Sequence, residues 1–164
     1  MHSVAVIMGS KSDEALVRPC VDILNKLGIK ALFTISSAHR TPERTEKLVA
    51  GLEKEGCKIF ICAAGLAAHL AGTVAARTVR PVIGIPVASG SLGGMDALLS
   101  TVMMPAGFPV ATLALDKTGA RNAAWLAAQI LALNDRELED KIRAARKEMA
   151  REVEQNANEL QPGT

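Results

Sequence analysis

Short apolar runs alternate with segments of helical periodicity along most of this chain. Residues 3–8 form an uninterrupted apolar run, which is typical of a parallel strand buried on both faces. From Leu16 to Leu27 apolar residues recur at helical spacing, and Gly28 fits the position just after a helix end. The first 28 residues therefore predict a strand followed by a helix.

The same alternation continues through the rest of the chain. Further strands are predicted over residues 31–36, 58–63, 82–87 and 110–115. Helices are predicted after Thr41-Pro42, read as N-cap and first helical residue, and over residues 95–102 and 122–133. Five strands alternating with helices predict an α/β fold, an open parallel sheet with helices on both faces, in one domain over residues 1–164.

The C-terminal part predicts a charged helix that extends the α/β unit. Asn134 and Glu137 have capping-box spacing. An apolar stripe follows at Leu138, Ile142, Ala145, Met149 and Val153. Residues 156–164 are expected to be a frayed tail.

Composition narrows the possible partners. Hydrophobic residues make up 49% of the chain, charged residues 22% and aromatic residues 2%, while alanines number 27. The net charge is +2, which does not favour nucleic acid as a partner, and the few rings exclude an aromatic stacking platform. Cys20, Cys57 and Cys62 are too few and too irregularly spaced for a disulfide framework, so they predict buried thiols in a reducing cytoplasm.

The centre of the chain is nearly free of charge. Residues 59–76, which end before Arg77, and residues 97–115, which follow Asp96, carry no charged side chain. Each window is almost long enough to cross a bilayer. Glycines interrupt the first window, and Pro105 and Pro109 interrupt the second. We therefore expect no membrane span, but strands buried on both faces and helices that pack against further protein.

Polar and glycine residues follow three of the predicted strands. Ligands of open α/β sheets bind at the carboxyl ends of the strands, so these residues are the candidate site. The first strand is followed by Ser10, Ser12 and Asp13, the second by Ser37, His39 and Arg40, and the third by Gly65, Ala68 and His69.

The loop after the first strand has two interpretations. Ser10 and Ser12 could donate hydrogen bonds to a phosphate at the start of a helix, and Asp13 could accept from ribose hydroxyls. The same residues could equally be a solvated helix cap. The loop has neither the Walker A nor the dinucleotide-binding glycine pattern.

His39 and Arg40 carry the stronger signal. Arginine binds phosphate or carboxylate, and histidine is the side chain suited to proton transfer near neutral pH. His69 lies among small residues and is interpreted either as a ligand contact or as a structural histidine. The wide spacing of the three histidines predicts no metal site.

Taken together, these segments resemble the PurE family of purine biosynthesis. The matching motifs are residues 8–13 (MGSKSD), 37–42 (SAHRTP), 64–70 (AGLAAHL), 81–87, 94–105 and 119–131. Nearly the whole chain is covered, in order. Two positions depart from the pattern, namely Ala71, where proline is usual, and Met103, where glutamine is frequent.

The resemblance implies a flavodoxin-like three-layer fold, assembled as an octamer. It implies N5-carboxyaminoimidazole ribonucleotide mutase activity, the transfer of a carboxylate from the exocyclic nitrogen to C4 of the imidazole, without cofactor. His39 is then the general acid/base. Substrate contacts are implied for Ser10, Ser12, Asp13, Ser37, Arg40, Gly65, Ala68, His69 and Leu70. The alternatives are a carboxylase that uses CO₂ directly and a non-catalytic nucleotide-binding module.

Overall fold

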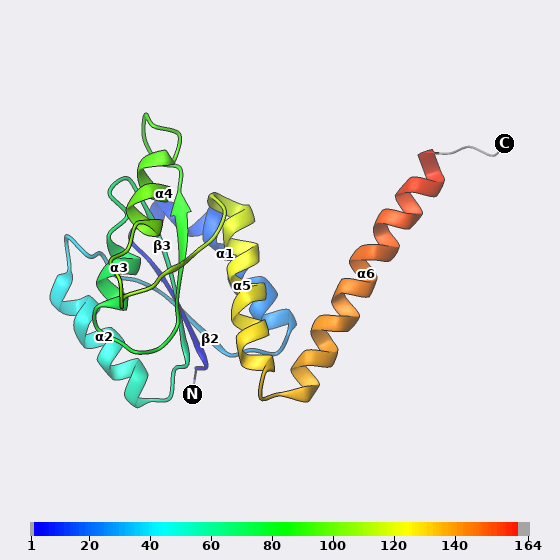
Figure 1. Ribbon diagram of the computed structural model, residues 1–164, viewed down its shortest axis with the longest axis horizontal. Coiled ribbons are helices and arrows are strands. Elements are labelled where there is room, and N and C mark those ends of the chain that lie inside the picture. Colours follow the sequence, from blue (N-terminus) through cyan, green and yellow to red (C-terminus); the bar gives the residue numbers. More distant parts are fainter. Residues whose placement is uncertain (1, 161–164) are drawn as a thin grey trace. The chain divides into compact units, whose positions relative to one another are not determined.

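A computed structural model describes residues 2–160 (Figure 1). Its strands are β1 (Val4–Met8), β2 (Ala31–Ile35), β3 (Ile59–Gly65), β4 (Val82–Val87) and β5 (Ala111–Thr112). Its helices are η1 (Lys11–Asp13), α1 (Glu14–Lys26), α2 (Pro42–Lys54), α3 (Leu70–Ala75), α4 (Met95–Val102), α5 (Asp116–Ala132) and α6 (Arg136–Leu160). The chain forms two compact units, one up to Ala127 and one from Ala128 onward.

The first unit is built on a five-stranded parallel sheet in the order β2-β1-β3-β4-β5. This is the strand order of flavodoxin-like folds, and it confirms the predicted α/β class. Figure 1 shows α2 and α3 on one side of the sheet and α1 on the other. The central strands β1 and β4 are buried along their whole length, as their continuous apolar sequences predict.

The fifth strand is much shorter than the six residues predicted. Only Ala111 and Thr112 pair with β4. The chain then turns at Asp116, which adopts a positive φ of 55° and begins α5 six residues earlier than expected. A Cβ added to Gly119 would lie 1.7 Å from the Ala114 carbonyl oxygen, so a glycine is needed where this first helical turn approaches the preceding segment.

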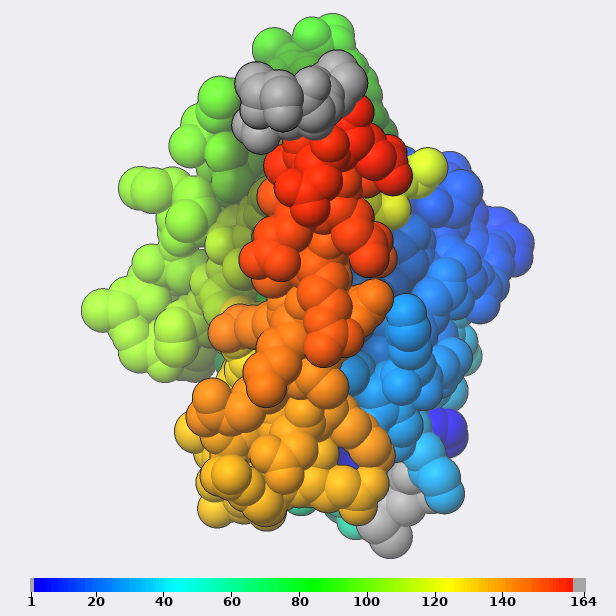
Figure 2. Space-filling view, turned by 90° about the vertical axis from the view of Figure 1, so that its right-hand side faces the viewer, coloured from blue at the N-terminus to red at the C-terminus, as the bar shows by residue number. Residues whose placement is uncertain are grey.

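The second unit contains the end of α5 and the predicted C-terminal helix α6, whose surface Figure 2 shows in orange and red. Its N-cap is Asp135, one residue later than expected, because the Asp135 carboxylate accepts from the Leu138 amide at 3.0 Å. The helix continues through Asn156 to Leu160, a stretch where the sequence predicts fraying, and residues 161–164 lie outside the described residues.

The cysteines are free and buried, in agreement with the prediction. Cys20 lies in α1 and Cys62 in the middle of β3, and Cys57 precedes β3. Burial raises the pKa of the Cys20 thiol to about 12 and also raises the pKa of Cys57 and Cys62. These thiols are therefore unreactive while the fold is intact. Among residues 2–160, no helix is both long enough and apolar enough to cross a membrane.

Candidate active site

A cavity of about 530 Å³ lies at the carboxyl ends of β1, β2, β3 and β4. Every residue that the sequence analysis assigned to the site lines it. The lining comprises Gly9, Ser10, Ser12, Asp13, Ser37, Ala38, His39, Arg40, Ala64, Gly65, Leu66, Ala67, Ala68, His69, Leu70 and Ser89. The structure therefore brings the three predicted segments together, and it adds Ser89. Neither Ala71 nor Met103, the two departures from the family pattern, is among the described lining residues.

The segment after β1 forms a hydrogen-bonded cluster at the start of α1. Ser10 caps η1, because its hydroxyl accepts from the Ser12 amide at 3.4 Å. The Ser12 hydroxyl lies 2.9 Å from Ser10 Oγ and 3.1 Å from Asp13 Oδ1. Burial raises the pKa of the Asp13 carboxyl, and the hydrogen bond from Ser12 and the charge of Arg40 partly oppose this. The cap and the ligand-binding interpretations of this loop are thus compatible.

A chain of hydroxyl groups fixes the loop after β2. Buried Ser36 and Thr45 share a hydrogen bond of 2.8 Å, and Thr45 also donates toward the Thr41 carbonyl at 3.2 Å. Thr41 is the N-cap residue of α2 and Pro42 its first residue, as the sequence predicts, but the Thr41 side chain makes no capping hydrogen bond. Its hydroxyl accepts instead from the Ser37 amide at 2.9 Å, and Ser37 Oγ accepts from the Arg40 amide at 3.1 Å. These hydrogen bonds therefore fix the backbone of residues 39 and 40 to the start of α2.

Arg40 connects two strand ends. Its Nη2 donates to the Gly9 carbonyl at 3.0 Å, so the guanidinium reaches from the loop after β2 to the end of β1. There it lies in the same cavity as Ser10, Ser12 and Asp13. A guanidinium has five donors, so most remain available for an anion. This placement produces a cation beside two hydroxyls, an arrangement suited to a phosphate.

The two histidines of the cavity form a direct hydrogen bond. His39 Nε2 and His69 Nδ1 lie 2.7 Å apart, and the rings meet edge to face with centroids 4.8 Å apart. In such a bond one nitrogen carries the proton and the other accepts it. Both side chains are exposed in the single chain. The pair places a proton donor and a proton acceptor in one cavity, between the ends of β2 and β3.

The segment after β3 brings its backbone close to the cavity. A side chain at Gly65 would displace the Ser89 hydroxyl, because an added Cβ would lie 1.7 Å from Ser89 Oγ. Leu66 adopts a positive φ of 54°, which is unfavourable for leucine. Ala68 and Leu70, which also line the cavity, are buried. Sequence reasoning missed Ser89, although its position directly after a fourth parallel strand could have indicated it.

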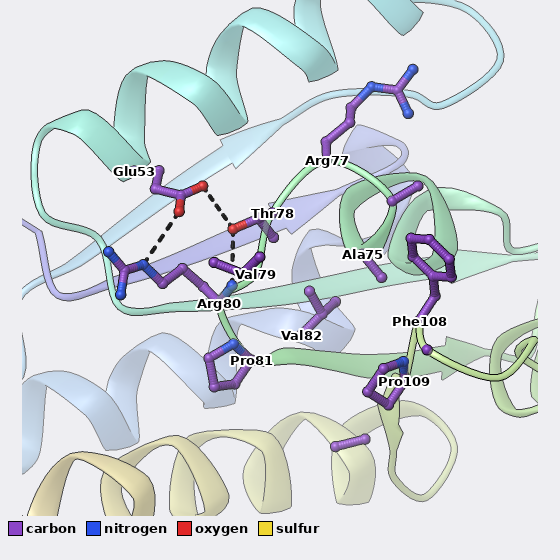
Figure 3. Close-up of a pocket in the computed structure, with 13 residues that line it drawn as sticks. Glu53, Ala75, Arg77, Thr78, Val79, Arg80, Pro81, Val82, Phe108 and Pro109 are labelled. Atoms are coloured by element: carbon purple, nitrogen blue, oxygen red, sulfur yellow. Dashed lines mark hydrogen bonds and ion pairs between the residues drawn. The ribbon is translucent and has the colours of Figure 1, made fainter.

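A larger cavity, of about 810 Å³, lies at the opposite end of the strands, where β4 and β5 begin (Figure 3). Its charged side chains are paired. Glu53 accepts from Thr78 at 2.8 Å and contacts Arg80 at 3.4 Å, and the Arg77 guanidinium donates to the Thr73 carbonyl at 3.1 Å. No histidine lines it among the described residues. The smaller cavity is therefore the candidate active site.

The described residues contain no group of three or more metal-ligating side chains.

Comparisons with known proteins show which family the chain belongs to. The AIR carboxylase family matches residues 3–152. Proteins named N5-carboxyaminoimidazole ribonucleotide mutase are 49% identical in Brucella melitensis (95% of this chain, 97% of the relative) and 46% identical in Pyrococcus horikoshii (96% and 88%). A crystal structure of Treponema denticola PurE superposes with a TM-score of 0.88 at 29% identity, covering 97% of this chain and 98% of that one. The chain belongs to the AIR carboxylase (PurE) family.

Proposed function

We propose that this protein is an N5-carboxyaminoimidazole ribonucleotide mutase, which converts that nucleotide into 4-carboxy-5-aminoimidazole ribonucleotide. The observation that carries the proposal is the hydrogen bond of 2.7 Å between His39 and His69 inside the cavity. A module that only binds nucleotide needs no proton donor beside a proton acceptor. Relatives at 44–49% identity carry the mutase name.

The proposed reaction needs one proton moved in two directions. The exocyclic nitrogen of the substrate must gain a proton as its carboxylate leaves as CO₂, and C4 must lose a proton after CO₂ has bonded there. Protonated His39 gives the first proton, becomes neutral, and takes the second, so the enzyme returns to its starting state. The other ring nitrogen of His39 stays bonded to His69 throughout, which assigns the transfer to His39 Nδ1. His69 holds the ring and its tautomer.

The remaining cavity residues would bind the nucleotide. Arg40, Ser10 and Ser12 supply a cation and two hydroxyls for the phosphate, and Asp13 supplies a carboxylate for the ribose hydroxyls. The backbone of residues 65–70 and the side chain of Ser37 would contact the base and its carboxylate. His39 and His69 are exposed in the single chain, so retention of CO₂ would need additional cover, which we propose another subunit supplies.

Turnover of the two possible substrates tests this function. The protein should convert the N5-carboxylated nucleotide without ATP or added metal, and it should be far slower with aminoimidazole ribonucleotide plus bicarbonate. Efficient use of the second pair alone would establish the direct carboxylase instead. Binding of both nucleotides without conversion of either would establish a non-catalytic module.

We further propose that the protein assembles with copies of itself, as an octamer. An apolar stripe on and beside α4 supports self-association, since Leu92, Met95, Leu99, Val102 and Met103 are each about half exposed or more. Such a surface is larger than single exposed residues produce, and it needs cover. Light scattering of the wild-type protein should give eight times the chain mass. The variant Leu99→Glu should give a smaller mass, whereas a monomeric wild type would contradict the proposal.

We also propose a cytoplasmic location. Three free, buried cysteines are consistent with a reducing compartment. Cell fractionation with a cytoplasmic marker enzyme tests this directly.

A further inference from the structure

Ser89 occupies a side of the cavity to which the sequence motifs assign no residue. It follows β4, whose carboxyl end lies next to that of β3. The preceding residue is fixed, because the Ala88 amide donates to Asp116 Oδ1 at 2.9 Å. Asp116 in turn holds a positive φ of 55° at the start of α5. The backbone on which Ser89 stands is thus anchored to a helix.

The Ser89 hydroxyl reaches the cavity over Gly65. A Cβ at residue 65 would lie 1.7 Å from Ser89 Oγ and 3.0 Å from the Val87 carbonyl oxygen. The hydroxyl therefore occupies the space that a side chain at residue 65 would take. Ser89 is exposed in the single chain, and within the part of the chain that the structure describes its hydroxyl bonds to no protein group. The hydroxyl is therefore open to a ligand that enters the cavity.

The polar groups of the cavity divide along the sheet. Arg40, Ser10 and Ser12 lie at the ends of β2 and β1, and they are the donors suited to the phosphate. Ser89 lies at the end of β4, on the far side of β3. Of the lining side chains that follow β3 and β4, only His69 and Ser89 are polar within the described residues. A nucleotide whose phosphate lies over β1 and β2 would extend its base toward β3 and β4.

We propose that Ser89 donates a hydrogen bond to the substrate carboxylate once it is bonded to C4, and so distinguishes carboxylated from uncarboxylated nucleotide. This inference rests on the mutase function proposed above. A carboxylate has about four acceptor positions and needs donors in place of the water it loses. His69, the other polar side chain on this side of the cavity, is hydrogen-bonded to His39, whereas the Ser89 hydroxyl can donate to a ligand. No covalent step is involved.

Calorimetric binding of two nucleotides to the full-length protein tests this role. The ligands are 4-carboxy-5-aminoimidazole ribonucleotide and aminoimidazole ribonucleotide, which differ only in the carboxylate. Ser89→Ala should weaken binding of the first about tenfold, the size expected for a hydrogen bond to a charged group, and should change binding of the second by less than about twofold. The matched control is Ser91→Ala, in the same exposed loop but outside the described cavity lining. It should leave both affinities unchanged.

Two results would overturn the assignment of Ser89. Equal weakening of both nucleotides in Ser89→Ala would show a general effect on the loop, and unchanged affinity for both would show no contact. Thermal melting of both serine variants confirms that they fold. If the wild-type protein binds neither nucleotide, the mutase function itself is wrong, which is a different outcome from wild-type binding that Ser89→Ala leaves intact.

Discussion

The buried hydroxyl pair beneath the His39 loop leads to a quantitative prediction for the variant Thr45→Val. Thr45 is fully buried, and Ser36 is 1% exposed. Valine keeps the shape of threonine but removes the oxygen that lies 2.8 Å from Ser36 Oγ. The Ser36 hydroxyl is then buried without this partner, which costs about 1–3 kcal/mol of unfolding free energy. For a chain of this size each kcal/mol lowers Tm by about 2–4 °C, so we expect a loss of several degrees.

A second buried threonine provides the control. Thr101 is 2% exposed, and its hydroxyl donates at 2.7 Å to the Ala97 carbonyl of its own helix, α4. That carbonyl also has its ordinary helical partner, so Thr101→Val leaves no group orphaned. Both variants exchange one hydroxyl for one methyl at a buried helix position. Urea unfolding should show a clear loss for residue 45 and a change below about 1 kcal/mol for residue 101.

The activity of Thr45→Val adds a second measurement. Thr45 donates toward the Thr41 carbonyl, and the Thr41 hydroxyl holds the loop that carries His39. The variant should therefore lose kcat under conditions in which it is fully folded. Thr45→Ser, which keeps the oxygen, should retain most of the rate. Equal destabilisation by the two valine variants, or a wild-type rate for Thr45→Val, would refute the reasoning.

Three further outcomes follow from the cavity. His39→Asn should abolish turnover while product binding, measured by calorimetry, survives; near-normal turnover would remove His39 from the mechanism. Arg40→Ala should raise the Kd of the product at least tenfold, because a charge-assisted contact to phosphate is lost, and an unchanged Kd would place the phosphate elsewhere. Asp13→Asn should raise the free energy of unfolding near pH 7. Burial raises the pKa of the Asp13 carboxyl above its ordinary value of about 3.9. As the pH rises above that value, the buried carboxyl loses its proton and the folded state loses stability. The gain should disappear below that pH, and urea unfolding at pH 3.5 and pH 7 checks this.

Much of this fold could be predicted because single elements carried strong patterns. The apolar sequences of β1 and β4 left no alternative to buried parallel strands, and Gly28, with φ 81°, ends its helix as expected. The early start of α5 could not be predicted, because it follows a turn at Asp116 in the αL conformation. The Asp116 carboxylate accepts there from the Ala88 amide, which is 28 residues away in sequence and therefore invisible to local patterns.

In the candidate site, too, local patterns predicted some features, while others depend on contacts between residues far apart in sequence. Rules for parallel sheets placed Ser10, His39 and Gly65 at one edge, and the cavity contains all of them. The bond between His39 and His69 spans 30 residues and depends on side-chain conformations that no local pattern encodes. Thr41 shows how far a local rule reaches. The rule for N-caps placed Thr41 and Pro42 correctly, but it could not predict that the Thr41 hydroxyl accepts from the Ser37 amide instead of capping the helix.

The three buried thiols can report local opening of the folded protein. A thiol reagent in solution can modify Cys20, Cys57 or Cys62 only when the surrounding structure opens, because all three are at most 1% exposed. The modification rate is then the rate for a free thiol multiplied by the equilibrium constant of opening. Since one thiol lies in α1 and another in the middle of β3, comparing their rates measures whether the helical layer detaches from the sheet or both open as one cooperative unit. The native sequence thus supports site-resolved stability measurements without any engineered label.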